Sequence, residues 1–274
     1  MDIFGQTRSR VERNYALITP DTHVPSPLIN WKNSTAVVHI SPQMGARFTQ
    51  YTATMEEKSE AGAPGETAER FIYVQEGSCT LAVDENRKNA DLRDLTTPRH
   101  ELKVGAYAFI PCGMGHLISS KAGCTLIVFE KTYQPNANFP PASAVIGHAD
   151  DVNGEPFMGD EDARLKTLLP INESFDMAVN LFTYQPGATL PQVEIHVMEH
   201  GLMMLEGQGV YRLGDDYMPV MAGDVIWMAS YCPQWFVAMG KTPATYIYYK
   251  DIHRDRLCET ELKDQMVQRL ANLR

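Results

Sequence analysis

Residues 71–83 have the sequence FIYVQEGSCTLAV, and residues 202–213 repeat its pattern as LMMLEGQGVYRL. In each copy a Glu-Gly pair separates two largely apolar runs, which is typical of two strands joined by a turn. A second pair of related stretches follows, VGAYAFIPCGMGH at 104–116 and AGDVIWMASYCPQ at 222–234. Because an internal repeat defines architecture more firmly than local propensity does, the sequence predicts two similar β domains in one chain.

The rest of the chain also favours a mainly β fold. One helix is expected at residues 260–274, because Leu262, Met266, Leu270 and Leu273 share one helical face. That apolar stripe suits packing over a barrel mouth or at an oligomer interface. Further predicted strands, rich in β-branched and aromatic residues, are TAVVHI (35–40), YAFIP (107–111), CTLIVFEKTY (124–133), MAVNLFTY (177–184), VEIHVM (193–198) and ATYIYYKD (244–251).

The length and the position of breaker residues predict the domain boundaries. A chain of 274 residues suits two modest domains, each able to bury a core. Residues 133–162 are rich in Pro, Gly and Asp, which indicates a linker that wraps the surface. We expect a first domain at 1–135, a linker at 136–178 and a second domain, with the helix, at 179–274.

The composition limits the kinds of partner. A formal net charge of −10 argues against nucleic acid and anionic membranes, which need clustered Lys and Arg. Five cysteines without a Cys-x-x-Cys pair suit reduced thiols in a cytosolic protein. No apolar run approaches the roughly 18 residues of a membrane span, and the first residues lack the apolar core of a signal peptide. We expect a soluble, cytoplasmic homo-oligomer that acts on a small molecule.

Three side chains that can bind metal occur together in QVEIHVMEHG, residues 192–201. They are Glu194, His196 and His200. On a strand, Glu194 and His196 share one face, and the aliphatic residues between them face the other way. A satisfied polar cluster is the alternative interpretation, but the pattern favours a divalent metal site.

The second pair of repeated stretches carries a resemblance to a known superfamily. Gly105, Pro111, Gly113 and His116 follow the second cupin motif, in which Gly, Pro, Gly and His recur at fixed spacing. The doubled pattern resembles a bicupin. This resemblance implies two antiparallel β-barrels of the jelly-roll type in a single chain.

The cupin resemblance also implies where a metal would bind. Cupin barrels take ligands from a His-x-His-x-x-x-Glu motif and from the histidine of the second motif. In the second copy these positions hold Glu194, His196, His200 and Gln234. Two imidazoles, a carboxylate and an amide oxygen form an oxygen-rich set that favours Mn²⁺ over thiophilic metals, although affinity alone would select Cu or Zn. We expect one Mn²⁺ per chain, with open positions for water or substrate.

The first copy has different residues at the same positions, namely Pro64, Glu66, Arg70 and His116. Proline cannot ligate a metal, and an Arg guanidinium repels a cation. The first barrel is therefore predicted to lack a metal site, with His116 as a hydrogen-bonded barrel histidine.

A more specific resemblance covers nearly the whole chain. NYALITPDTHVPSPLINW at 14–31, EIHVMEHGLMMLEGQGVYRL at 194–213, YCPQ at 231–234 and KDIHRD at 250–255 are similar to the (S)-ureidoglycine aminohydrolase family, bicupin enzymes of purine-ring catabolism. Glu at the first ligand position and Gln at the last depart together from the general cupin pattern. The resemblance implies hydrolysis of (S)-ureidoglycine to (S)-ureidoglycolate and ammonia.

The same resemblance implies roles for individual residues. Tyr211, Tyr246 and Lys250 contact the substrate, with Tyr246 and Lys250 catalytic, and the ligands Glu194 and Gln234 also face it. Lys250 ends a predicted strand, where its ammonium could pair with a substrate carboxylate. Tyr246 lies four residues earlier and therefore on the same strand face.

Three other functions fit a bicupin. A metal-dependent dioxygenase would contain iron and consume oxygen, a sugar- or ligand-binding bicupin would have no turnover, and an isomerase would need a proton shuttle that the sequence does not reveal. The joint occurrence of Glu194 and Gln234, with Lys250 sixteen residues after Gln234, favours the aminohydrolase.

Overall fold

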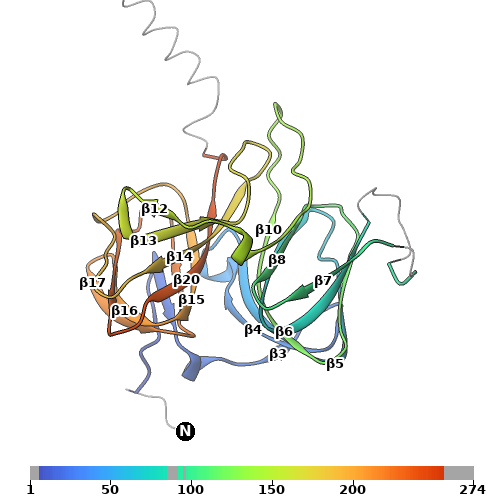
Figure 1. Ribbon diagram of the computed structural model, residues 1–274, viewed down its shortest axis with the longest axis horizontal. Coiled ribbons are helices and arrows are strands. Elements are labelled where there is room, and N and C mark those ends of the chain that lie inside the picture. The colour runs from blue at the N-terminus through green and yellow to red at the C-terminus, as the bar shows by residue number, and fades with distance from the viewer. Residues whose placement is uncertain (1–5, 85–91, 95–96, 256–274) are drawn as a thin grey trace, which may run out of the picture.

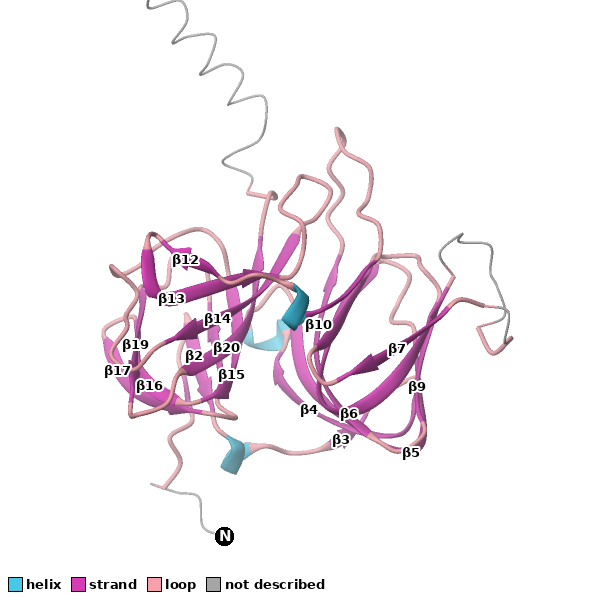
Figure 2. Cartoon of the chain, viewed as in Figure 1, coloured by secondary structure: helices cyan, strands magenta, loops and turns pink. Residues whose placement is uncertain are grey.

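The computed structural model describes residues 6–84, 92–94 and 97–255. In this part of the chain, strands form two barrel-like units side by side (Figure 1). The predicted mainly β fold is confirmed, and the helix expected at 260–274 lies outside the described residues. No helix among the described residues is long and apolar enough to span a membrane. The helices found there are three short 3₁₀ turns (Figure 2), η1 (Pro20–Thr22), η2 (Pro42–Met44) and η3 (Ala149–Asp151).

The N-terminal barrel is a nine-stranded sheet that curls around its own core. The order along the sheet is β11-β8-β6-β10-β5-β4-β3, while β7 pairs with β6, and β9 pairs with β5 and β6. Fully buried Ile72, Leu81, Ile118 and Leu126 lie in that core. The strands are β3 (Ser26–Pro27), β4 (Trp31–Ile40), β5 (Thr49–Gly62), β6 (Ala68–Val83), β7 (Arg99–Lys103), β8 (Ala106–Ile110), β9 (His116–Ser120), β10 (Cys124–Thr132) and β11 (Val145–His148).

The C-terminal barrel is built from two sheets. Eight strands in the order β1-β2-β18-β15-β20-β14-β13-β12 form one sheet, and β17-β16-β19 form the other. Leu202 and Tyr246 of the larger sheet belong to one core with Leu213 and Phe236 of the smaller one. The strands are β1 (Arg10–Val11), β2 (Tyr15–Ile18), β12 (Glu155–Phe157), β13 (Asp160–Thr167), β14 (Met177–Tyr184), β15 (His200–Glu206), β16 (Gln208–Leu213), β17 (Asp216–Met221), β18 (Val225–Met228), β19 (Gln234–Met239) and β20 (Ala244–Asp251).

The repeated Glu-Gly pair marks the corner of each barrel. Gly77 and Gly207 have φ of 71° and 72°, the left-handed region that favours glycine. A Cβ at Gly77 would lie 2.4 Å from the carbonyl oxygen of Gly123, and one at Gly207 would lie 2.3 Å from that of Pro243. The predicted turn between two strands is confirmed in the second copy, between β15 and β16. In the first copy the backbone bends at Gly77 but remains one strand, β6.

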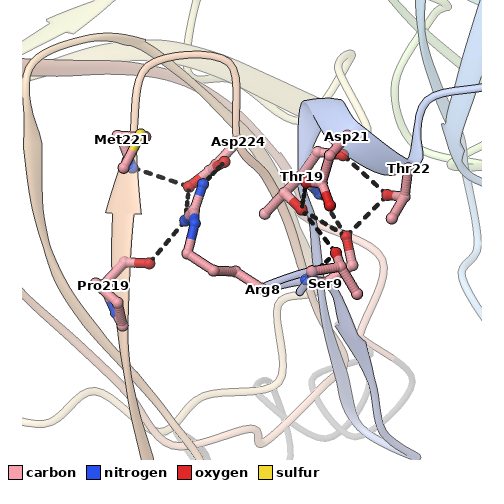
Figure 3. Close-up of polar contacts among 9 residues, drawn as sticks. Arg8, Ser9, Thr19, Asp21, Thr22, Pro219, Met221 and Asp224 are labelled. Carbon is pink, nitrogen blue, oxygen red and sulfur yellow. Dashed lines mark hydrogen bonds and ion pairs between the residues drawn. The ribbon is translucent and has the colours of Figure 1, made fainter. Parts of the chain in front are cut away.

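The first strands of the chain join the C-terminal barrel, although the sequence assigns residues 1–135 to the N-terminal domain. Strand β2 pairs with β18, and in Figure 1 the blue N-terminal segment lies in the left-hand barrel. Arg8 holds this segment in place, with Nη1 and Nη2 donating to the buried Asp224 carboxylate at 2.6 and 2.9 Å (Figure 3). Beside it, the hydroxyls of Ser9 and Thr19 lie 2.8 Å apart. Pairing between distant strands is not visible in sequence.

The segment predicted to be a linker, 136–178, contains strands of both barrels. Strand β11 pairs with β8 of the N-terminal barrel, whereas β12 and β13 extend the larger sheet of the C-terminal barrel. The connection therefore adds an edge to each barrel, and two of its Pro and Gly residues, Gly147 and Pro156, lie within these short strands.

A shared apolar interface joins the barrels. The side chains of Phe71 and Phe129 from the N-terminal barrel lie in one buried cluster with Trp227 and Tyr249 from the C-terminal barrel. The rings of Phe48 and Tyr249 stack at 4.2 Å between centroids. The larger C-terminal sheet thus packs on both faces, outward against the N-terminal barrel and inward around its own core.

Candidate active site

Residues 193–198 do not form the predicted strand. Glu194 alone makes an isolated bridge, in which its N–H donates to the Gln234 carbonyl at 2.8 Å and its carbonyl accepts from the Gln234 N–H at 3.0 Å. Val193 and Ile195 are 37% and 60% exposed, so they point away from the site, as predicted, but into solvent. Alternation identifies two faces of an extended segment, and it does not reveal whether neighbouring strands are present to pair with it.

The four predicted metal ligands lie together in the C-terminal barrel. His200 begins β15 in the larger sheet, and Gln234 begins β19 in the smaller one. The Nε2 atom of His196 lies 3.1 Å from Nε2 of His200 and 2.9 Å from Nε2 of Gln234. The Glu194 carboxylate is 3.9 Å from the same His196 nitrogen. Side chains from both sheets therefore meet around one imidazole.

Both histidine rings hydrogen-bond the backbone. The Nδ1 atom of His196 lies 3.1 Å from the Met198 carbonyl oxygen, which can only accept, so Nδ1 carries a proton. The ring of His200 hydrogen-bonds the backbone of Tyr249, and burial, reinforced by His196 and Lys250, lowers the pKa of His200 well below its usual range. A backbone contact at one nitrogen, with Nε2 directed at the shared cluster, is typical of metal-ligating imidazoles.

No metal site is shown as such, because among the described ranges no three His, Cys, Asp or Glu side chains are grouped closely enough to hold an ion. The donor set nevertheless fits one chemically. Glu194 offers the charge that two neutral imidazoles lack, and a half turn of the Gln234 amide would present its oxygen in place of its nitrogen. Burial raises the pKa of Glu194, against the opposing effects of His196 and Lys250. A cation would relieve that cost of desolvation.

Lys250 lies directly opposite His200 on the neighbouring strand. The two residues are partners in the β15–β20 register, so their side chains share the face that lines the barrel interior. Tyr246 and Tyr248 face the same way, at intervals of two along β20. Burial lowers the pKa of Lys250, and the charge of Glu194 opposes this shift. A partly desolvated ammonium next to neutral imidazoles is well suited to bind a carboxylate.

Buried tyrosines continue the site into the barrel. The hydroxyl of Tyr211 donates to the Gln234 side-chain oxygen at 3.5 Å, and the hydroxyls of Tyr246 and Tyr184 lie 3.1 Å apart. Burial raises the pKa of all three phenols, so each remains neutral. Sequence reasoning missed Tyr184, because a single tyrosine at the end of an apolar strand has the pattern of a core residue.

The corresponding position of the N-terminal barrel holds a side-chain cation. The Arg70 guanidinium is buried, donating to Nε2 of His116 at 2.8 Å and to the Glu130 carboxylate at 2.6 Å. His116 Nδ1 lies 3.1 Å from the Met114 carbonyl oxygen. Burial and the charge of Arg70 lower the pKa of His116 to about 3. The prediction of a hydrogen-bonded barrel histidine is confirmed.

The other two positions of the first copy do not join this cluster. Pro64 and Glu66 lie in the connection between β5 and β6, and Glu66 is exposed. Of the four positions, the structure therefore brings together only Arg70 and His116.

The chain has the architecture of a bicupin, with two antiparallel β-barrels, one of which brings together imidazole, carboxylate and amide side chains. A family model described as Cupin domain matches residues 180–249. The chain is 39% identical to the (S)-ureidoglycine aminohydrolase of Arabidopsis thaliana, over 93% of this chain and 82% of that protein. It is 32% identical to the (S)-ureidoglycine aminohydrolase of Escherichia coli K12, over 88% and 90%. The crystal structure of protein Ylba from E. coli superposes with a TM-score of 0.78 at 29% identity, over 91% of this chain and 96% of that one.

These similarities span nearly the whole length of both partners. The chain belongs to the (S)-ureidoglycine aminohydrolase family, a family of hydrolases. The resemblance expected from the ligand motifs is confirmed.

Proposed function

We propose that this protein hydrolyses (S)-ureidoglycine to (S)-ureidoglycolate and ammonia in ureide degradation, with Mn²⁺ bound by Glu194, His196, His200 and Gln234. The observation that carries the proposal is the position of a half-buried Lys250 opposite His200 on the neighbouring strand, within the same barrel as the other three potential ligands. That arrangement puts a carboxylate-binding ammonium next to a metal-binding donor set, and ureidoglycine has both a carboxylate and nitrogen ligands.

Each residue has a role that follows from its chemistry. Lys250 pairs with the substrate carboxylate, and its partial burial strengthens this pairing. The neutral phenols of Tyr211 and Tyr246 can donate to and accept from the ureido group, and Tyr246 orients the reacting carbon. The buried walls of the barrel exclude bulk water, which strengthens these polar contacts.

The proposed reaction replaces one bond at a single carbon. Water adds to the carbon that carries the amino group, the C–N bond breaks, and the nitrogen leaves as ammonia with the electron pair and a proton. A divalent metal held by the four ligands supplies Lewis-acid stabilisation of the charge that develops. Because carboxylate, amine and ureido groups are all held at one stereocentre, the mirror-image substrate would leave a buried polar group unpaired, which explains selection of one enantiomer.

The decisive experiment combines metal analysis of the purified protein with ammonia release from freshly prepared (S)-ureidoglycine. We expect manganese in the wild type, loss of metal in Glu194→Ala, and retained metal with lost turnover in Lys250→Ala. Glu66→Ala is the matched control, because Glu66 occupies a ligand position of the first copy but is exposed. Bound iron with oxygen consumption, and no ammonia above the spontaneous background, would overturn the proposal in favour of a dioxygenase.

The proposal also covers the setting of the reaction. We place the protein in the cytoplasm as a homo-oligomer. Its proposed partner is a small-molecule ureide, because the net charge of −10 disfavours nucleic acid and anionic membranes. Size-exclusion chromatography with light scattering tests the assembly, and a monomeric mass would contradict it.

A further inference from the structure

The two central residues of the proposed site are each adjacent to a carboxylate on the other side of the sheet. Glu199 immediately precedes His200, and Asp251 immediately follows Lys250. Because neighbouring side chains in extended backbone point to opposite faces, Glu199 and Asp251 face away from the barrel interior. The Asp251 carboxylate accepts the Glu199 backbone N–H at 2.5 Å. The positions of these two carboxylates are thus linked to those of His200 and Lys250.

A single arginine of the N-terminal barrel contacts both carboxylates. Arg47, in the connection between η2 and β5, lies 3.2 Å from Glu199 through Nε and 2.6 Å from Asp251 through Nη2, and its backbone N–H donates to Glu199 at 3.0 Å. Its Nη2 also donates to the Ser230 hydroxyl at 2.9 Å, in the loop that leads to β19. The indole N–H of Trp227 completes the environment of Glu199 at 2.8 Å.

Phe48, the residue after Arg47, packs against β15 and β20, the strands that carry His200 and Lys250. Phe48 stacks on Tyr249, the neighbour of Lys250, and lies against Gly201, the neighbour of His200. A Cβ at Gly201 would come within 2.4 Å of the Phe48 ring, so this close approach requires glycine. Arg47 and Phe48 together therefore fix the outer face of the two strands whose inner face carries His200 and Lys250.

We propose that Arg47, supplied by the N-terminal barrel, is a positioning residue for the active site in the C-terminal barrel. Its guanidinium pairs with both Glu199 and Asp251 and thereby sets the separation of His200 and Lys250. Without it, the buried Glu199 and the partly buried Asp251 lose the cation that bridges them, and the two strands shift to rehydrate the carboxylates. Displacements near 1 Å at a catalytic centre cost roughly 100-fold in rate. This inference rests on the proposed function, and it gives the N-terminal barrel a role in the reaction.

The test compares Arg47→Ala with Arg164→Ala, a change of another half-exposed, ion-paired arginine, which lies on β13. With saturating Mn²⁺, we expect kcat/KM for (S)-ureidoglycine to fall 10- to 100-fold in Arg47→Ala and to stay within threefold of wild type in Arg164→Ala. Arg47→Lys keeps the charge but lacks the forked geometry, so we expect an intermediate loss. Adding Asp251→Asn to Arg47→Ala removes the uncompensated charge and should recover at least threefold.

Mn²⁺ affinity provides a readout that does not depend on the substrate. Because His200 is displaced, we expect the dissociation constant for Mn²⁺ to rise about tenfold in Arg47→Ala, as for other residues that orient metal ligands. If wild type releases no ammonia, the proposed function fails, and this titration alone decides the role of Arg47. Kinetics and Mn²⁺ affinity within threefold of wild type, or a loss that Asp251→Asn does not recover, would overturn the inference.

Discussion

The two barrels share the glycine turn at the repeated Glu-Gly pair, but they differ in the side chains at the cupin metal positions. Gly77 and Gly207 adopt nearly the same left-handed backbone, and each lets a strand pass close to a neighbouring carbonyl. At the positions that cupins use for metal, however, the N-terminal barrel has Arg70 against His116, while the C-terminal barrel has His200 near the amide of Gln234. Backbone geometry is thus retained where the chain must turn, and side-chain chemistry differs where a ligand would bind.

The N-terminal barrel holds a cation that is part of the chain, whereas the proposed function requires the C-terminal barrel to bind an exchangeable one. The Arg70 guanidinium is attached to the chain and already paired with Glu130, so no further cation can approach His116 at low cost. In the other barrel the Nε2 atoms of His196 and His200 lie 3.1 Å apart, and Lys250 is the partner of His200 on the neighbouring strand. We therefore expect the Arg70–His116 pair to affect stability and the His196–His200 pair to affect activity.

The largest expected contrast comes from removing one buried histidine from each barrel. His200→Ala should reduce kcat/KM for (S)-ureidoglycine by about 1000-fold, because it removes a ligand that supports transition-state charge. His116→Ala should leave kcat/KM within about threefold of wild type. Steady-state ammonia release measures both variants, and a comparable loss in His116→Ala would mean that the two centres are coupled.

Removing the fixed cation should affect stability more than activity. In Arg70→Met the Glu130 carboxylate loses its guanidinium partner. Among the described residues it keeps the hydrogen bond from the Tyr51 hydroxyl, at 2.8 Å. We expect the free energy of unfolding to fall by about 3 kcal/mol, as for other buried pairs that lose one member. Urea denaturation measures this, and adding Glu130→Gln should recover part of the loss. An unchanged midpoint would show that the pair is not a net stabilising contact.

The pH dependence of stability should identify His116. Its pKa of about 3 in the folded protein lies below its ordinary value near 6.5, so the unfolded chain binds the extra proton between these limits. The contribution of neutral His116 to the free energy of unfolding is therefore fully present above pH 6.5 and is lost as the pH falls towards 3. Between pH 6.5 and 5 this corresponds to about 2 kcal/mol. Urea denaturation of wild type and His116→Gln at both pH values should show the smaller pH dependence in the variant, and equal slopes would contradict the assignment.

The smallest effect concerns the tyrosine that lies behind Tyr246. Tyr184→Phe removes the hydroxyl that lies 3.1 Å from that of Tyr246, leaving the Tyr246 hydroxyl with Tyr211 as its other side-chain partner. We expect a loss of about fivefold in kcat/KM, close to 1 kcal/mol. Tyr217→Phe is the control, because Tyr217 is an exposed tyrosine of the same barrel. Equal rates for wild type and Tyr184→Phe would show that Tyr246 needs no such partner.

Much of the site was predictable because its residues occur in recognisable local patterns. Glu194, His196 and His200 lie within one short stretch, and Gln234 follows from its distance to a turn glycine. The family resemblance implies Lys250 and Tyr246, and alternation along one strand puts them on the same face. Tyr184, in contrast, has no local signal, because its role depends on a hydroxyl from a strand that is paired only in the folded protein.

By itself, the sequence determined the β class, the repeat with its Glu-Gly pairs, and the clustering of Glu194, His196 and His200, because each depends on the properties of residues close together in the chain. Tertiary structure decided that β2 joins the C-terminal sheet, that the expected linker supplies strands to both barrels, and that Arg47 reaches the outer face of the site. These features arise from pairings between residues far apart in sequence, each favoured by burial and hydrogen bonding that exist only after the barrels have folded.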